Sequence, residues 1–300
     1  MRASFYTIIA LIAFAANSLF CRMALADGYI DAWSFTAIRL LSAASSLGVI
    51  MIFHTHYLRR QVQGLDRAAT SETRFILDDK GSWISSISLV IYALCFSIAY
   101  TALDTGTGAL ILFSAVQLTM IGWSIYKKEQ LSTLQWLAFV VALAGFIYLM
   151  LPSAATPSLL AATLMAVSGM AWGVYSIRGK TCISPLRATG FNFIRSLIMV
   201  PLFLMVGISY LDNITTIGIW LACASGAVAS GLGYSIWYTA MPLLRTTQAA
   251  VVQLCVPILA AILGMVFLSE PLTLRFIATS TIILGAVLIF ILNKKTAPKT

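Results

Sequence analysis

Long runs of apolar residues alternate with short polar connections along the whole of this 300-residue chain. Each run holds about 20 residues, which is the length that an α-helix needs to cross the hydrocarbon core of a bilayer. The pattern predicts an all-α integral membrane protein with ten transmembrane helices, near residues 3–21, 32–53, 83–103, 105–126, 132–151, 158–177, 188–208, 216–240, 246–268 and 272–292.

The composition agrees with this pattern. Hydrophobic residues make up 60% of the chain and charged residues only 10%, whereas an ordinary soluble domain has roughly 25% charged residues. The mean hydropathy of +0.93 points the same way. We therefore expect the lipid bilayer to be the main environment and partner of this chain.

The basic residues indicate how the helices cross the membrane, because cytoplasmic loops carry an excess of Lys and Arg. If the N-terminus is cytoplasmic, fifteen of the nineteen basic residues fall on the inner side: Arg2, Arg59, Arg60, Arg67, Arg74, Lys80, Lys127, Lys128, Arg178, Lys180, Arg187, Arg245, Lys294, Lys295 and Lys299. This predicts a multi-pass protein of the plasma membrane, the inner membrane in bacteria, with both termini cytoplasmic. The net charge of +9 then reflects topology, and the dispersed basic residues predict no nucleic-acid partner.

The chain also resembles itself. The segment FTAIRLL (35–41) aligns with FNFIRSL (191–197) at an offset of 156, and Glu129 aligns with Glu270 at an offset of 141. The offset falls because the long inner loop after the second span has no equally long counterpart. Two halves of five spans follow, residues 1–153 and 154–300, and an odd number of spans inverts the second half relative to the first. Inverted repeats of this kind are typical of transporters.

Further features resemble a known family. A glutamate follows spans four and nine (Glu129 and Glu270), small pairs stand late in spans five and ten (Ala144-Gly145 and Gly285-Ala286), and the segment QLCVPILAAILGMVFLSEPLT covers residues 253–273. Together with the ten spans, these resemble the drug/metabolite transporter superfamily. Within it the chain is similar to the EamA family, and there to the YddG type of amino-acid exporter. The first half departs from the family pattern, since Val116 aligns with Pro257.

The resemblance implies a central cavity formed by spans one, three, four, six, eight and nine. It also implies alternating access and export of small metabolites, with aromatic or other apolar amino acids as the nearest substrate class. The function predicted is that of a membrane transporter for a neutral or zwitterionic small molecule. The alternatives are an exporter of another metabolite or drug in the same superfamily, or a membrane pore that is not a carrier.

Two arginines, Arg39 and Arg195, stand about two turns inside spans two and seven. A charge in the middle of the membrane costs on the order of 3 kcal/mol or more, so such arginines suggest function. The favoured interpretation is nevertheless structural or gating: each side chain reaches toward its nearer interface or caps carbonyls between the halves. Direct contact with substrate is the alternative. The preference follows from the resemblance, which places spans two and seven in the outer wall.

Aromatic and hydroxyl side chains interrupt several spans and are candidates for the cavity wall. In span six, Ser168, Trp172 and Tyr175 share one helix face, while Gly169 and Gly173 form a packing face. The other aromatic candidates, in spans three and eight, are Tyr100, Tyr234 and Tyr238. Aromatic stripes at helical spacing also occur in ordinary cores and at lipid interfaces, and both interpretations stay open.

Amides inside the spans are stronger candidates, because an unpaired amide in hydrocarbon is costly. They are Asn17, Gln117 and Gln253. Gln253 stands one turn before Pro257, which lacks an N–H and is expected to kink span nine and free a carbonyl. The candidate role is substrate binding, and the alternative is an interhelical hydrogen bond.

All ten acidic residues fall in loops or at span ends. A proton-coupled exporter needs a group that binds its proton inside the bilayer, so we expect a facilitator or exchanger without obligatory proton coupling. A cavity without a fixed counter-charge also suits a net-neutral ligand, such as a zwitterionic amino acid, better than a phosphorylated one.

We predict no enzyme activity, no cofactor and no metal site. No Ser/His/Asp set or paired carboxylates occur within a span. The five cysteines, Cys21, Cys95, Cys182, Cys223 and Cys255, are widely spaced and indicate neither disulfides nor a metal framework. His54 and His56 lie at the inner loop and are poor candidates for metal ligands. A monomer is compatible with the sequence.

Overall fold

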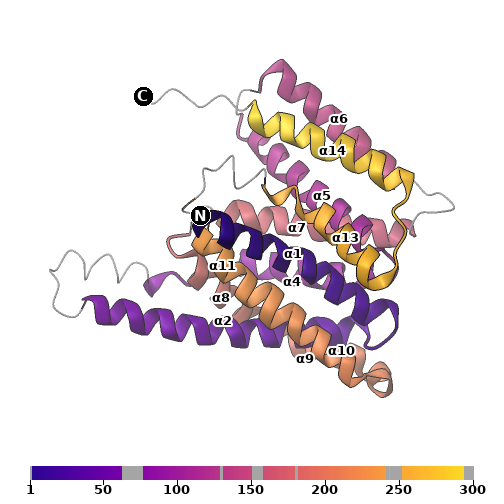
Figure 1. The fold of residues 1–300 in the computed structure, drawn as a ribbon. Coiled ribbons are helices and arrows are strands. Elements are labelled where there is room, and N and C mark those ends of the chain that lie inside the picture. The colour runs from indigo at the N-terminus through magenta and orange to yellow at the C-terminus, as the bar shows by residue number, and fades with distance from the viewer. Residues whose placement is uncertain are drawn as a thin grey trace.

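The structure is a computed structural model, and it describes residues 2–62, 77–128, 131–150, 158–179, 182–240, 243 and 252–293. These residues form helices joined by short loops, with no strand among them (Figure 1). In chain order the helices are α1 (Arg2–Ala26), α2 (Ala32–Val62), α4 (Trp83–Tyr100), α5 (Thr105–Tyr126), α6 (Thr133–Met150), α7 (Leu159–Gly179), α8 (Pro185–Ser196), η1 (Leu197–Met199), α9 (Val200–Gly207), η2 (Ile208–Asn213), α10 (Thr216–Cys223), η3 (Ala224–Leu232), α11 (Gly233–Ala240), α13 (Val256–Leu268) and α14 (Leu274–Leu292).

Eight helical stretches in the described residues are long and apolar enough to cross a membrane. Two further apolar helices, Thr133–Leu149 and Val256–Leu268, are shorter. The prediction of an all-helical membrane protein is therefore confirmed.

Short polar side chains fix where several helices begin. Ser132 and Gln135 form a reciprocal capping box: the amide N of Gln135 donates to Oγ of Ser132 at 3.2 Å, and the amide N of Ser132 donates to Oε1 of Gln135 at 2.9 Å. Ser82, Thr215 and Thr273 cap α4, α10 and α14 through their side-chain oxygens. Each cap satisfies an amide that the helix leaves without a partner.

Two of the predicted spans are not uniform α-helices. Residues 188–208 divide among α8, η1 and α9, and Pro201 stands in the first turn of α9, where its missing N–H breaks no helical bond. Residues 216–240 contain the π-helix η3 between two α-helices. Small residues allow η3 to approach α2: a Cβ at Gly226 would lie 2.3 Å from the carbonyl oxygen of Arg39. π-helical turns are frequent at functional sites.

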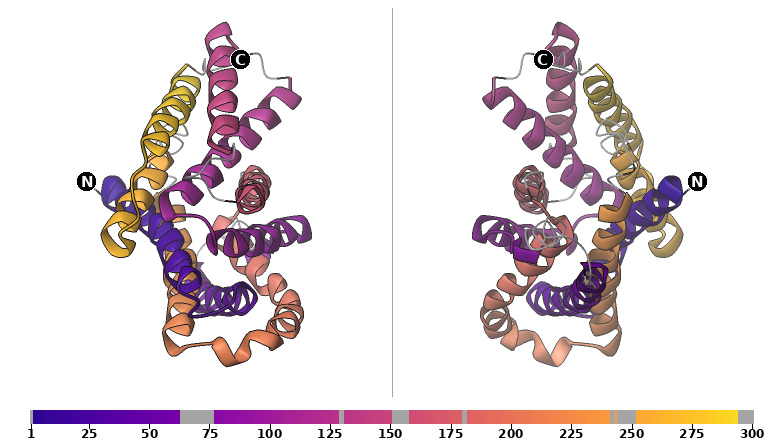
Figure 2. Two further views of the ribbon diagram at one scale, coloured as in Figure 1. Left: turned by 90° about the vertical axis from the view of Figure 1, so that its right-hand side faces the viewer. Right: turned by 90° about the vertical axis from the view of Figure 1, so that its left-hand side faces the viewer.

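The helices form one large packed group and one peripheral pair. α6 and α14 lie side by side, and in Figure 2 this pair projects away from the other helices. In the larger group α4 and α5 pack against α7, α1 packs against η3, α11 and α13, and α2 packs against η3, α8 and α9. α1 begins and α14 ends at the same end of the molecule, on the left of Figure 1. We call this the inner end and the opposite one the outer end.

Gly169 and Gly173 of α7 lie against α5, as the spacing of the two glycines predicts. A Cβ at Gly169 would lie 2.5 Å from the carbonyl oxygen of Leu112, and one at Gly173 would lie 2.8 Å from Cβ of Thr119. The two backbones therefore approach more closely than any larger residue would permit, which is the usual role of small residues between membrane helices.

We expect Gly169→Ala to lower the free energy of unfolding by about 1–3 kcal/mol, because the added methyl group would force α5 and α7 apart. Gly122 of α5 provides a matched control, since a Cβ there meets nothing within 4 Å. Gly122→Ala should leave stability unchanged or raise it by up to about 1 kcal/mol. Thermal unfolding of the purified variants in detergent measures both, and equal midpoints for the two variants would contradict this account.

Candidate functional site

A cavity of about 160 Å³ lies between the two halves of the chain. It is lined by α1, α4, α5, α7, η3 and α11, together with Gln253, which precedes α13. Its wall extends from the middle of α1 and α4, at Asn17 and Tyr92, to Gly179, the last residue of α7 at the inner end. Of the described residues, no Asp, Glu, Lys or Arg lines it.

Aromatic rings form much of this wall. Trp172 stands at the centre of the cluster: its ring stacks on that of Tyr175 at 5.1 Å and 16°, and on that of Tyr234 at 5.2 Å and 25°. Tyr92 approaches Trp172 from the side, with ring centroids 4.8 Å apart. Phe14 contacts Tyr234 at 5.8 Å. These rings come from α1, α4, α7 and α11, so folding brings them together from both halves.

A polar network crosses the aromatic wall and joins four helices. Oγ of Ser225 donates to Oδ1 of Asn17 at 2.6 Å, and Nδ2 of Asn17 donates to the hydroxyl of Tyr92 at 3.3 Å. Nη2 of Arg39 donates to the same hydroxyl at 2.9 Å. Asn17 therefore makes the interhelical hydrogen bonds of one interpretation and also lines the cavity, while its role in substrate binding stays a prediction.

Arg39 is buried within the bundle. Only 1% of the residue is exposed, and its guanidinium carbon lies 5.1 Å from the ring centre of Tyr92 and 4.8 Å from that of Phe96. The expectation that Arg39 reaches toward an interface is therefore corrected, because the two aromatic rings and the Tyr92 hydroxyl hold the guanidinium in place. Arg39 lies behind the cavity wall and does not line it.

Arg195 differs from its counterpart in the first half. Its Nη1 donates to the carbonyl oxygen of Lys80, and its guanidinium carbon lies 5.5 Å from the ring centre of Trp83. Lys80 and Trp83 stand at the inner end, where α4 begins. Arg195 thus caps a carbonyl near an interface, which is the structural role favoured for it.

The structure brings five of the nine predicted binding residues to the cavity: Asn17, Trp172, Tyr175, Tyr234 and Gln253. The side chain of Tyr238 lies outside the described part of the chain.

Three predicted binding residues lie elsewhere. Tyr100 is fully buried, and its hydroxyl donates to the carbonyl oxygen of Thr105 at 3.2 Å. Oγ of Ser168 donates to the carbonyl oxygen of Tyr92 at 2.9 Å and faces α4. Gln117 is buried next to Val116, which does line the cavity. The hydroxyls of Tyr100 and Ser168 therefore serve helix packing. Gln117 is the sequence neighbour of a cavity residue and does not line the cavity itself.

Pro257 does not kink a continuous helix in the described residues. α13 begins at Val256 with Pro257 in its first turn, after a turn at residues 254–255. A proline in a first turn loses no helical hydrogen bond. The break predicted near this proline is therefore a helix start, and it leaves Gln253 just before α13 on the cavity wall.

The residues missed by the prediction include Tyr92, the centre of both the aromatic and the polar contacts. Phe96 and Trp237 also line the cavity. Tyr92 and Phe96 stand four residues apart on one face of α4, a spacing that was visible in the sequence. What the sequence could not show is that Arg39 of another helix faces the same hydroxyl.

Cysteines and histidines take no part in the cavity wall. The five cysteines are all free, and Cys21 is buried while Cys255 is exposed. Within the described ranges, no three His, Cys, Asp or Glu side chains gather closely enough to hold a metal ion.

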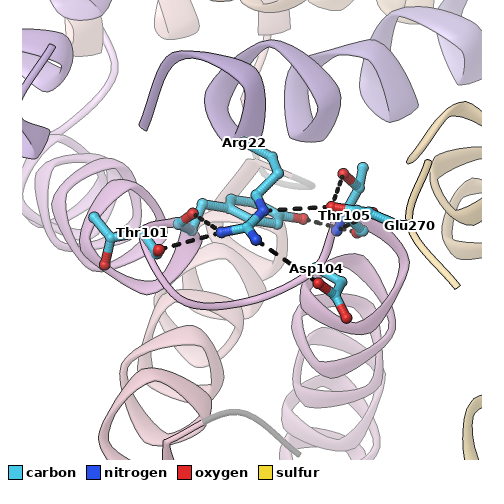
Figure 3. Close-up of polar contacts among 6 residues, drawn as sticks. Arg22, Thr101, Asp104, Thr105 and Glu270 are labelled. Carbon is cyan, nitrogen blue, oxygen red and sulfur yellow. Dashed lines mark hydrogen bonds and ion pairs between the residues drawn. The ribbon is translucent and has the colours of Figure 1, made fainter. Parts of the chain in front are cut away.

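A charged cluster lies at the outer end of the bundle (Figure 3). Arg22, near the end of α1, lies 3.3 Å from Oε1 of Glu270 and 3.7 Å from Oδ1 of Asp104. Its Nη1 also donates to the carbonyl oxygens of Tyr100 and Thr101, at 3.1 and 3.2 Å. One guanidinium thus ties α1 to the α4–α5 connection and to the loop between α13 and α14.

Glu270 is held from a second side by the start of α5. The amide N of Thr105 donates to Oε2 of Glu270 at 2.8 Å, and Oγ1 of Thr105 donates to Oε1 at 3.1 Å. Burial raises the pKa of this carboxyl above its ordinary value, and Asp104 raises it further, while the bonds from Thr105 and the charge of Arg22 lower it. Burial is the largest of these effects, so the net direction is upward.

Comparison with known proteins adds four findings. Residues 159–292 match the EamA-like transporter family. An uncharacterized protein of Pseudomonas aeruginosa is 43% identical over 288 residues, covering 95% of this chain and 93% of its own length. An uncharacterized transporter of Archaeoglobus fulgidus is 24% identical over 209 residues, which are 67% of this chain and 73% of that protein. A crystal structure of a protein with 14% identity superposes with a TM-score of 0.62 over 98% of this chain and 99% of that one, which shows a shared fold.

The raised pKa of Glu270 predicts a dependence of stability on pH. The folded state holds the proton more tightly than the unfolded state, so stability falls as pH rises from the ordinary pKa of a carboxyl through the raised one. Glu270→Gln keeps an oxygen for Thr105 but does not titrate. The melting temperature of the unmodified protein relative to this variant should therefore fall as pH rises above the ordinary pKa of a glutamate, about 4.3, and should level off once pH has passed the raised pKa of the folded state.

Arg22→Gln tests the cause of this dependence. Without the positive charge of Arg22, the pKa of Glu270 should rise further, and the fall in stability should move to higher pH. Melting curves are recorded for the unmodified protein and for Arg22→Gln, each with and without Glu270→Gln. The difference within each pair isolates the contribution of the Glu270 carboxyl from those of all other titrating groups. A difference that is independent of pH, or that grows as pH rises, would contradict the assignment.

Proposed function

Because this chain belongs to the EamA-like transporter family, we propose that it exports small neutral or zwitterionic metabolites, most closely aromatic or apolar amino acids, across a bacterial inner membrane by alternating access. Membership makes it a multi-pass membrane transporter with a small-molecule substrate, and points away from an enzyme. The observation that carries the finer proposal is a cavity lined from both halves of the chain by aromatic, amide and hydroxyl groups, with no charged residue among its described lining.

The proposed architecture has ten spans in two inverted halves, residues 1–153 and 154–300. Support comes from the helix pairings, which occur in matched sets when α1 is equated with α7, α2 with α8 and α9, α4 with α10 to α11, and α5 with α13. α4 packs on α7 as α11 and η3 pack on α1; α5 packs on α7 as α13 packs on α1; and α4 packs on α8 as η3 packs on α2. Three further contacts join a helix to its own equivalent in the other half: α5 packs on α13, α6 on α14, and α2 on α8. Such self-matching is what inverted repeats around one central site produce.

The direction of loading follows from the placement of the cavity. Its wall reaches the inner end at Gly179, while Arg22, Asp104 and Glu270 join α1 to two connections at the outer end. The distribution of basic residues makes the inner end, with both termini, cytoplasmic. In this conformation a substrate would enter from the cytoplasm, and export requires the Arg22 cluster to separate.

The chemistry of the wall supports the substrate class. Stacked rings with a few amide and hydroxyl groups favour a ligand with an apolar portion and a polar end. Because no carboxylate lines the described cavity, the wall offers no proton-binding acid, which supports transport without obligatory proton coupling.

Counterflow in proteoliposomes tests the carrier mechanism. Vesicles loaded with an unlabelled aromatic amino acid should accumulate the labelled form transiently and saturably, and an imposed pH gradient should not raise the plateau. Trp172→Ala should reduce the affinity at least roughly tenfold by removing the central ring. Trp123→Ala, which removes a half-exposed ring outside the cavity, is the matched control. Linear, unsaturable uptake would indicate a pore, and accumulation driven by the gradient would indicate proton coupling.

Reporter fusions test the architecture separately from the substrate. A reporter that fluoresces only in the cytoplasm should be active at both chain ends, and alkaline phosphatase, which is active only outside, should be active when inserted after Gly28 in the α1–α2 connection. Chain ends on opposite sides of the membrane would exclude two five-span halves.

A further inference from the structure

Tyr92 lines the cavity, and its hydroxyl proton has no acceptor among the described residues. Both of its hydrogen bonds come from donors: Nη2 of Arg39 at 2.9 Å and Nδ2 of Asn17 at 3.3 Å. Ser225, which donates to Oδ1 of Asn17, fixes the orientation of that amide. These bonds occupy the lone pairs of the phenolic oxygen, so the hydroxyl can only donate its own proton. Tyr92 and Asn17 both line the cavity, so a ligand there can accept it.

Arg39 adds a positive charge directly behind this hydroxyl. The ion pairs in the described residues both belong to Arg22, so no carboxylate there neutralises Arg39. Its Nη1 atom also has no hydrogen-bond partner among those residues. A guanidinium does not deprotonate in a protein, and a buried, unpaired charge is unfavourable. The centre of the bundle is therefore electrostatically incomplete and favours a negative group on the far side of Tyr92.

We propose that Tyr92, oriented by Arg39 and Asn17, is the substrate-binding residue that donates to a carboxylate of the transported molecule. This inference rests on the proposed transport of amino acids and specifies which end of the ligand is recognised. Donation to a carboxylate also draws on the charge of Arg39, since a hydrogen-bond chain that begins at a cation polarises its last donor. Arg39 is a positioning residue, because it contacts the hydroxyl of Tyr92 and does not itself line the cavity.

The same placement orients the rest of the ligand. With a carboxylate at Tyr92, in the middle of the bundle, the remainder of an amino acid extends along Trp172 toward the inner end. The faces of Trp172, Tyr175 and Tyr234 can contact an apolar side chain or the ammonium group. A net-neutral molecule with a carboxylate satisfies both the buried cation and a cavity that lacks other charges, so amines and amides of the same shape should be rejected.

A matched ligand series on the purified protein tests this assignment without altering the chain. The probes are L-phenylalanine, its carboxamide, phenethylamine and hydrocinnamate, with leucine and its carboxamide as a second pair. We expect each amino acid to raise the melting temperature and to bind roughly ten- to a hundredfold more tightly than its carboxamide, the range expected when a hydrogen bond to a charged group is lost.

Variants identify the residues responsible. Tyr92→Phe keeps the ring against Trp172 and should reduce the preference for acid over carboxamide to about threefold or less. Arg39→Gln retains a donor for Tyr92 but removes the charge, and should reduce the preference in the same direction. Tyr126→Phe makes the same chemical change at an exposed tyrosine outside the cavity and should keep the full preference. A purely structural role for Tyr92 would change the melting temperature but leave the ratio of affinities intact.

The outcomes separate this inference from the function on which it rests. Equal binding of acid and carboxamide overturns the role of Tyr92 while leaving amino-acid transport standing. Binding of hydrocinnamate but of neither amino acid, with dependence on Tyr92, supports the carboxylate site and overturns the amino-acid proposal. If no carboxylate in the series binds, or if binding survives Tyr92→Phe with its full preference, the carboxylate site is excluded.

Discussion

Arg39 lies inside a bundle of apolar helices and cannot lose its charge there, so its environment must supply what water would otherwise supply. The hydroxyl of Tyr92 accepts a hydrogen bond from the guanidinium of Arg39, and the rings of Tyr92 and Phe96 lie next to that guanidinium. This contact fixes the position of α2 relative to α4, and through Asn17 and Ser225 it extends to α1 and η3. Gly226 of the π-helix η3 also lies close to the backbone of Arg39. The centre of the protein is thus organised around one cation.

The outer end contains a second cation, Arg22, which differs from Arg39 in having carboxylate partners. Arg22 has two carboxylates and two carbonyls within reach, and its partners lie on connections instead of helix interiors. Partial exposure makes such pairs weak individually, and they gain strength when they share one guanidinium. The two cations therefore differ in their surroundings: Arg39 and its contacts are buried, whereas Arg22 and its partners are partly exposed.

The equivalence of the two arginines in sequence does not extend to their roles. Arg39 and Arg195 occupy the same repeat position, but Arg39 lies deep beside the cavity and Arg195 caps a carbonyl at the inner end. The residues around them account for the difference, because Tyr92 stands opposite Arg39, whereas Trp83 and Lys80 stand next to Arg195. The two positions therefore share a sequence pattern but not their contacts.

The sequence by itself determined that the chain is helical and suited to a bilayer, because the length of its hydrophobic runs matches the thickness of a bilayer. It also determined the main helix boundaries, because capping residues such as Ser82 and Thr273 act locally. It also determined the packing role of Gly169, which depends only on helical periodicity. Trp172, Tyr175 and Asn17 were found because polar and aromatic groups stand out in apolar helices. Only the tertiary structure decided that Tyr100 and Ser168 face helix contacts, that Pro257 begins a helix, and that Tyr92 is the meeting point of Arg39 and Asn17. Those outcomes depend on the rotation of each helix about its own axis and on which neighbour it faces, and in a nearly uniform apolar sequence the local pattern carries little information about either.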